Sequence, residues 1–149
     1  MSDEPTLRAR ALRLLARREY SRKELSRRLA PHAASPEELE ELLDALAARG
    51  QLSDERYAES RVHALTKKYS AARILHELKS KGVDAVVAER AAAEARNTDL
   101  ERARVAWRRK FKSAPVTREE RARQARFLQS RGYSFDVIRA VLNSGEETA

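Results

Sequence analysis

The fold is decided by Gly50-Gln51-Leu52-Ser53-Asp54-Glu55-Arg56-Tyr57-Ala58, a stretch that joins two predicted helices. Gly50 ends a leucine-rich helix, because glycine readily adopts the left-handed conformation that closes helices. Ser53 or Asp54 can cap the next helix by accepting its free backbone N–H groups. Tyr57 then begins the apolar face of that helix. The stretch therefore predicts a junction between two helical repeats.

Similar start and stop signals recur on both sides of this junction. Capping boxes are predicted at Ser21, Thr98 and Thr117, each with a glutamate three residues later, and simple caps at Ser35, Ser70 and Ser134. Proline and glycine mark the ends. We expect nine helices, near residues 6–18, 21–31, 35–50, 54–68, 70–82, 84–96, 98–115, 117–132 and 134–145. In the sixth, the residues expected to face the core are Val83, Val86, Val87 and Ala91.

The chain also repeats itself. Leu78-Lys79-Ser80-Lys81-Gly82-Val83 matches Leu128-Gln129-Ser130-Arg131-Gly132-Tyr133, and Tyr20-Ser21 matches Tyr69-Ser70. This periodicity predicts an all-α protein of three tandem three-helix repeats, at residues 1–50, 51–97 and 98–149. Each repeat is too small to bury much surface alone. We therefore expect neighbouring repeats to pack into an elongated, curved solenoid.

Composition excludes several classes of function. The 149 residues contain no Cys, so no disulfide or thiolate metal site is expected. No run of apolar residues is long enough to span a membrane, and residues 1–10 do not resemble a secretory signal. The three histidines lack metal-ligand spacing, and the glycines form no phosphate-binding loop. We expect a cytoplasmic, monomeric protein that is not an enzyme and that needs no cofactor.

The net charge of +8 indicates a polyanionic or acidic partner. The net charges of the three repeats are +1, +2 and +5. Basic residues cluster around the junction of the first and second helix of each repeat. The residues that we expect to bind are Arg18, Arg22, Lys23, Arg27, Arg28, Lys67, Lys68, Arg73, Arg108, Arg109, Lys110, Lys112 and Arg121. Aligned repeats would place them in a stripe suited to a phosphate backbone. Alternatively, these side chains only solvate the helices. Tyr20 and Tyr69 are candidates for stacking on bases.

Three segments resemble the RecX family of RecA regulators. The stretch Gly50–Ala58 is similar to the family's G-x-(L/I)-x-D-x-x-(F/Y)-A junction. The segment from Ile74 to Val83 is similar to I-x-x-E-L-x-x-K-G-(V/I), and the segment from Leu128 to Ser134 to L-x-R-R-G-(F/Y)-(S/D). The matched motif residues are interpreted as structural, forming caps, core and turns: Gly50, Asp54, Tyr57, Glu77, Gly82 and Gly132.

The resemblance implies a nine-helix protein that binds the RecA filament on single-stranded DNA. It also implies lower ATPase, strand-exchange and coprotease activities of RecA. Whether such a protein caps filament ends or fills the filament groove stays open. The main alternative is a general module that binds nucleic acid, single- or double-stranded, without reading its sequence. A helical enzyme is a third hypothesis, which would need a buried polar constellation that the sequence does not reveal.

Overall fold

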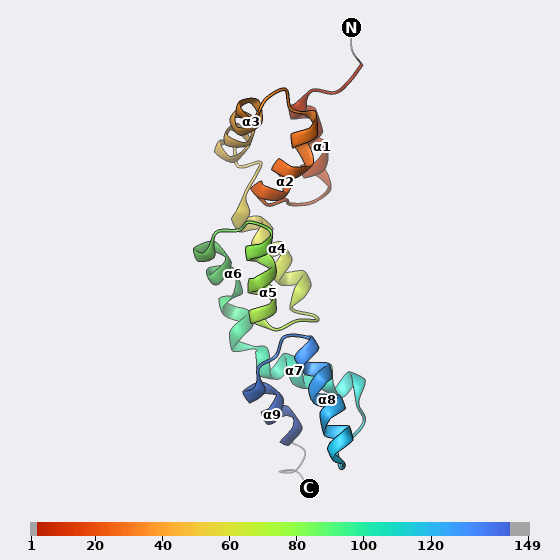
Figure 1. Cartoon of the computed structure of the whole chain (residues 1–149). Helices are drawn as coiled ribbons and strands as arrows, with labels where there is room; N and C mark the ends of the chain where they lie inside the picture. The colour runs from red at the N-terminus through yellow and green to blue at the C-terminus, as the bar shows by residue number, and fades with distance from the viewer. Residues whose placement is uncertain (1–2, 144–149) are drawn as a thin grey trace. The chain divides into compact units, whose positions relative to one another are not determined.

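The computed structural model describes residues 3–143 (Figure 1). Within this range every regular element is helical. The elements are α1 (Leu7–Arg17), α2 (Arg22–Leu29), the 3-10 helix η1 (Ala30–His32), α3 (Pro36–Ala48), α4 (Asp54–Leu65), α5 (Ala71–Ser80), α6 (Ala85–Asn97), α7 (Asp99–Lys110), α8 (Arg118–Ser130) and α9 (Phe135–Asn143). The nine α-helices confirm the predicted all-α repeat fold. The stop expected at Gly145 lies outside the described residues.

Most of the predicted helix starts are confirmed in atomic detail. Ser21 and Thr117 each form a complete capping box with the glutamate three residues later. The hydroxyls of Ser35, Ser70 and Ser134 each accept a hydrogen bond from the backbone N–H three residues on, at 3.1–3.2 Å. These bonds satisfy N–H groups that have no partner inside the helix.

The capping box predicted at Thr98 and Glu101 is wrong. Thr98 has φ −107° and ψ 3°, which is not the extended backbone of an N-cap, and its side chain makes no capping bond. Its hydroxyl instead donates to the carbonyl of Ala95, at 3.2 Å. The physical reason is that α6 and α7 are separated by this single residue, so Thr98 satisfies the end of one helix rather than the start of the next.

Two further side chains lie differently from the prediction. Val86 does not face the core, because it is 62% exposed, and the inner stripe of α6 is formed by Ala88, Ala92 and Ala95. At the Gly50–Ala58 junction the cap is Ser53, whose hydroxyl accepts the N–H of Arg56 at 3.2 Å. Asp54 instead accepts a hydrogen bond from the backbone of Arg22 in the preceding repeat.

The chain forms two compact units that do not coincide with single repeats. One unit runs up to Ser60 and adds Leu78–Ala88, and the other holds Arg61–Glu77 and continues from Glu89. In the first, α1, α2 and α3 share a core of leucines that includes Leu25, Leu43 and Leu46. In the second, α7, α8 and α9 share a core with Leu128, Val141 and Leu142. Each unit thus includes one whole three-helix bundle.

In the first unit, the start of α2 is bound to the next repeat by partly buried hydrogen bonds. The Ser21 hydroxyl is fully buried; it caps α2 and also donates to the carbonyl of Lys81, at 2.7 Å. The backbone N–H of Arg22 donates to the carboxylate of Asp54, at 2.8 Å. Asp54 therefore does for α2, across the junction, what a capping side chain does within one helix.

The second unit repeats this arrangement at the start of α5. The buried Ser70 hydroxyl caps α5 and donates to the carbonyl of Gly132, at 2.8 Å. The N–H of Ala71 donates to the carboxylate of Asp99, at 2.9 Å. In both units, then, a serine and an aspartate satisfy the first turn of a repeat's second helix and attach it to the following repeat.

The approach is so close that only glycine fits in the docked turn. A Cβ at Gly82 would lie 2.4–3.0 Å from side-chain carbons of Lys23, and one at Gly132 would lie 2.5 Å from the Ser70 hydroxyl and 2.7 Å from Cβ of Arg73. Both glycines have positive φ, at 85° and 92°. The predicted turn glycines therefore have a second function, which is to let two repeats touch.

Replacing Gly82 with Ala should destabilise the first unit more than replacing Gly50 with Ala. Both residues have positive φ, so each substitution should lower the free energy of unfolding by about 1–2 kcal/mol through backbone strain. Only Gly82 has a close neighbour, since nothing lies within 4 Å of a Cβ at Gly50. Overpacking should add roughly 1–3 kcal/mol. Urea unfolding followed by circular dichroism measures the difference, and equal losses would contradict the docked turn.

Ser21→Ala should likewise cost more than Ser35→Ala, although both serines cap helices in the first unit. Loss of a cap alone removes about 1 kcal/mol from the free energy of unfolding. At Ser21 the partly buried carbonyl of Lys81 also loses its donor, which adds roughly 1 kcal/mol or more. Thermal and urea unfolding of the two variants provide the comparison. A loss at Ser35 as large as that at Ser21 would show that the bond across the junction contributes nothing.

Candidate functional site

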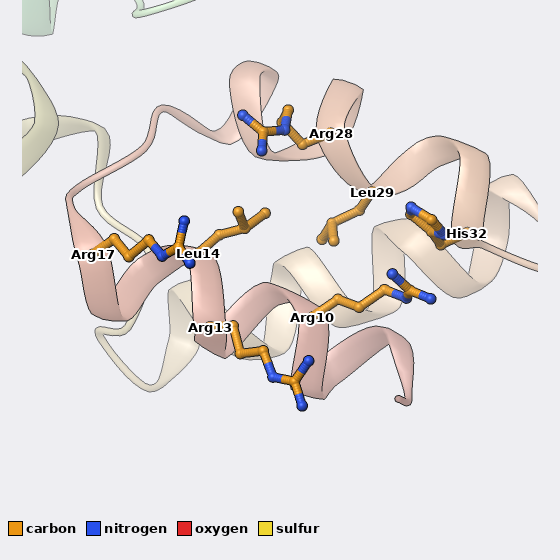
Figure 2. Close-up of a pocket in the computed structure, with 7 residues that line it drawn as sticks. All are labelled: Arg10, Arg13, Leu14, Arg17, Arg28, Leu29 and His32. Carbon is orange, nitrogen blue, oxygen red and sulfur yellow. The ribbon is translucent and has the colours of Figure 1, made fainter. Parts of the chain in front are cut away.

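A pocket of about 250 Å³ lies between α1 and α2 in the first unit. Its lining residues are Arg10, Arg13, Leu14, Arg17, Arg28, Leu29 and His32. We call it the N-terminal basic pocket. Figure 2 shows its two leucines directed toward each other between the helices, with the basic side chains around them.

The helix geometry of α1 produces this arrangement. Arg10, Arg13 and Arg17 are spaced by three and four residues, so they share one face of the helix. Arg28 at the end of α2 and His32 in η1 extend the basic rim from the other side (Figure 2). The apolar floor and the cationic rim together favour an anion carried on an organic group.

The guanidinium groups of this pocket have no acidic partner in the described part of the chain. No ion pair there includes Arg10, Arg13, Arg17 or Arg28, and no Asp or Glu lines the pocket. Arginine stays protonated at every pH at which proteins are folded. The pocket is therefore a permanent concentration of positive charge.

A second pocket, of about 660 Å³, lies in the other unit. Its lining residues are Thr66, Lys67 and Lys68 after α4, then Arg102, Val105, Ala106, Arg109 and Lys110 on α7, and Phe127 and Arg131 on α8. We call it the C-terminal basic pocket. The helices α7 and α8 are the first and second helices of their repeat, as α1 and α2 are of theirs. The two pockets therefore occupy the same position in repeats 3 and 1.

The C-terminal basic pocket differs in containing an aromatic ring. Phe127 packs edge to face against Phe111, with ring centroids 5.5 Å apart. The guanidinium of Arg131 lies 4.8 Å and the ammonium of Lys110 lies 5.8 Å from the centre of its ring. Cations around a partly exposed ring are typical of surfaces that bind single-stranded nucleic acid.

Arg102 supports the wall of this pocket rather than offering charge to a ligand. Its guanidinium donates to the backbone carbonyls of Thr66, Tyr69 and Ala95, at 3.0, 2.5 and 2.8 Å. It also pairs with Asp99, at 2.6 Å. The chain after α4 is thereby held next to α7, which brings Lys67 and Lys68 to the pocket.

Several residues expected to bind from the sequence are engaged in internal contacts. Arg22 pairs with Glu40 and Asp44 of α3, at 2.8 and 2.7 Å. Burial opposes its charge, but the hydrogen bonds to these carboxylates outweigh burial and raise the pKa of Arg22. Arg18 pairs with Glu24 and stacks on the ring of Tyr20. Both arginines hold the first bundle together.

The remaining expected residues are divided between internal contacts and the exposed surface. Arg73 donates to the carbonyl of Ser130, and Arg121 donates to Asn143. Arg108 pairs weakly with Glu101, at 3.4 Å. The stem of Lys23 packs beside Gly82. The expected residues that line one of the two pockets are Arg28, Lys67, Lys68, Arg109 and Lys110, while Arg27 and Lys112 are exposed elsewhere.

Neither of the two tyrosines considered for base stacking is freely exposed. Tyr20 is only 4% exposed, because Arg18 covers its ring, so it cannot stack on a base. Tyr69 is half-buried under Arg73. The ring that does line a pocket is that of Phe127, which was not among the residues expected to bind. Likewise, the pocket residues Arg10, Arg13, His32 and Arg131 were not singled out. Helical spacing of the arginines on α1 was the signal that could have identified the first two.

Other chemistry is not supported by the described residues. Between residues 3 and 143, no group of three or more His, Asp or Glu side chains could hold a metal ion. None of the helices in that range has the length and hydropathy needed to cross a bilayer. Of the structural motif residues, Tyr57 is 2% exposed, and Glu77 pairs with Arg61 at 2.8 Å.

Comparison with known proteins identifies the repeats. Three family models match in order: the first, second and third three-helix domains of RecX, at residues 8–46, 53–91 and 97–142. A regulatory protein RecX of Leptothrix cholodnii is 53% identical over 137 residues, which cover 92% of this chain and 87% of that protein. A regulatory protein RecX of Chromobacterium violaceum is 44% identical over 142 residues, which cover 95% and 92%.

A solved structure shares the fold. The crystal structure of RecX from Lactobacillus salivarius superimposes with a TM-score of 0.79 at 21% identity, and the match covers 95% of each chain. The family matches extend over all three repeats and confirm the resemblance seen in the sequence. The chain belongs to the RecX family.

Proposed function

We propose that this chain is a non-enzymatic regulator of the RecA recombinase. It binds the RecA filament on single-stranded DNA and lowers the ATPase, strand-exchange and coprotease activities of RecA. The observation that carries the proposal is the match of all three RecX domains, together with relatives that are named regulatory proteins.

The charges of the two units support a nucleoprotein as the partner. The filament presents DNA phosphates together with protein, so a binding surface for it needs cations that are not already neutralised. Each basic pocket offers such cations: Arg13 and Arg17 in the N-terminal pocket, Lys68 and Arg109 in the C-terminal one. The paired Arg18 and Arg22 are poor choices for testing this, because their loss would disturb the bundle itself.

A general nucleic-acid-binding module is the second candidate. It is favoured by the net charge of +8 and by the cation-flanked ring of Phe127. The two candidate functions predict different inhibition of RecA when this protein is present at much less than one molecule per RecA monomer. A filament regulator acts at that ratio because it binds a polymer with many coupled subunits. A simple DNA binder must instead occupy much of the DNA before RecA activity falls.

The first test is RecA ATPase on single-stranded DNA with this protein at about one tenth of the RecA concentration. We expect most of the ATPase activity to be lost with the wild-type chain. The variant Lys68→Glu with Arg109→Glu should need about tenfold more protein for the same inhibition, which corresponds to ~1.4 kcal/mol of binding energy. Its helicity should be unchanged, since both side chains are exposed and unpaired in the described residues.

The matched control is Arg90→Glu with Arg139→Glu. These residues lie in the same unit, are exposed, and change the net charge by the same amount, but they line neither pocket. We expect this variant to inhibit within about twofold of wild type, as long-range charge effects are screened at physiological salt. No inhibition by the wild-type chain, with tight and salt-dependent binding to bare DNA, would favour the general module.

A further inference from the structure

We propose that the N-terminal basic pocket is a phosphate site that holds one backbone phosphate of single-stranded DNA. The proposal rests on the proposed function for the source of that phosphate, which is the DNA of the filament. It assigns the contact to Arg10, Arg13, Arg17 and Arg28, with His32 as a further donor at the rim (Figure 2).

The first argument for a phosphate is that the positive charge of this pocket is not neutralised by acidic residues. Some arginines elsewhere in this unit are paired with acids, as Arg22 is with Glu40 and Asp44 and Arg56 is with Glu19, whereas Arg8, Arg27 and Arg49 lie outside the pocket and take part in none of the ion pairs observed among the described residues. The pocket arginines surround the two leucines, and no carboxylate is among the lining residues (Figure 2). Like charges in such a concavity repel one another and oppose folding. An anion bound between them removes that repulsion, so the pocket is suited to gain binding energy from a ligand.

The type of cation selects the ligand. Guanidinium groups are planar and present parallel N–H donors, which match two oxygens of a phosphate at once. A tetrahedral phosphate offers oxygens in several directions, so side chains on both α1 and α2 can share it. Acidic protein side chains are planar and offer two oxygens, which fit the fork of one arginine. The two-sided arrangement therefore favours phosphate over an acidic protein surface.

The volume of the pocket and the residues at its base limit which part of the DNA it can hold. The volume of about 250 Å³ is below the roughly 300–1,000 Å³ of pockets that enclose drug-sized molecules, so a whole nucleotide should not be enclosed. Leu14 and Leu29 offer apolar contact to an attached sugar. The lining residues include no Phe, Tyr or Trp ring for a base to stack on, and no Asn or Gln to read an adenine edge. The site should therefore bind the backbone without sequence preference.

The C-terminal basic pocket is the contrasting case in the same fold. There lysines predominate among the free cations, and the floor includes the ring of Phe127. Ammonium groups act as point charges, and the ring can receive a base. Equivalent positions in two repeats thus have different chemistry, and the N-terminal pocket is the one built for a single phosphate.

The test measures binding of the full chain to a fluorescent oligothymidylate by anisotropy, without RecA. The pocket variant is Arg13→Gln with Arg28→Gln, one change from each wall. We expect its dissociation constant to rise about tenfold and its dependence on salt to become less steep. The matched control, Arg8→Gln with Arg49→Gln, removes the same two charges from the same unit outside the pocket. Its dissociation constant should rise no more than about twofold.

Two further measurements distinguish a DNA phosphate from an acidic protein surface as the ligand. An oligonucleotide with an uncharged methylphosphonate backbone should bind wild type and pocket variant equally weakly. Polyglutamate should compete poorly with the labelled DNA. If it displaces the DNA as well as unlabelled oligothymidylate does, and only from the wild-type chain, the pocket binds an acidic protein surface and the proposal is wrong. Equal losses in the two Gln variants would also overturn it, because charge alone would then explain binding.

A last variant separates fold from binding and this proposal from the proposed function. Arg13→Lys with Arg28→Lys keeps the charge but removes the forked donors, so we expect weaker DNA binding with unchanged helicity. Wild-type affinity in that variant would contradict the bidentate phosphate site. RecA is absent throughout, so a failure here leaves RecA inhibition untouched. Conversely, a chain that binds DNA through this pocket but does not inhibit RecA would contradict only the proposed function.

Discussion

A buried serine hydroxyl that serves two repeats at once is the constraint on which the rest of the structure depends. Ser21 and Ser70 each cap a helix of their own repeat and donate to a backbone carbonyl in the turn of the next. Without these bonds the buried hydroxyls would lose hydrogen bonding to water with no replacement, and the partly buried carbonyls would lose their donors. The sequence at both sites must therefore keep a small polar cap opposite a glycine turn, so two separate positions are fixed together.

This constraint also explains why the compact units differ from the sequence repeats. The turn that contains Gly82 docks on the start of α2, so part of the second repeat belongs to the unit of the first. The turn that contains Gly132 docks on the start of α5 in the other unit. A three-helix repeat alone would leave the hydroxyl and the N–H groups at its second helix without their partners. Packing between repeats is thus part of the fold of each unit, as expected for small repeats that cannot bury a core alone.

Local signals in the sequence were enough to predict most of the helices. The signals are short-range: caps such as Ser21 and Thr117 and turn glycines such as Gly132 act within three or four residues. Residue preferences at helix ends can therefore be recognised in the sequence alone. Two roles were missed for different reasons. Thr98 bonds to Ala95, only three residues before it, because the end of one helix directly precedes the start of the next. Asp54 caps a helix 32 residues earlier, through a contact that only the folded chain makes. Tertiary contacts of this kind leave no periodic pattern in a single sequence, so they could not be predicted from it.

The candidate site was harder to predict, because charge clusters in the sequence do not show which charges are neutralised. Arg22 and Arg28 lie in the same predicted cluster, yet three-dimensional packing gives Arg22 two carboxylates and places Arg28 at an acid-free pocket. A neutralised arginine contributes to stability and has little charge left for a ligand. Unneutralised arginines that gather in one pocket repel one another until an anion binds between them. Binding capacity in a highly charged helical protein therefore depends on the cations that lack acids, and only the fold separates these from the rest.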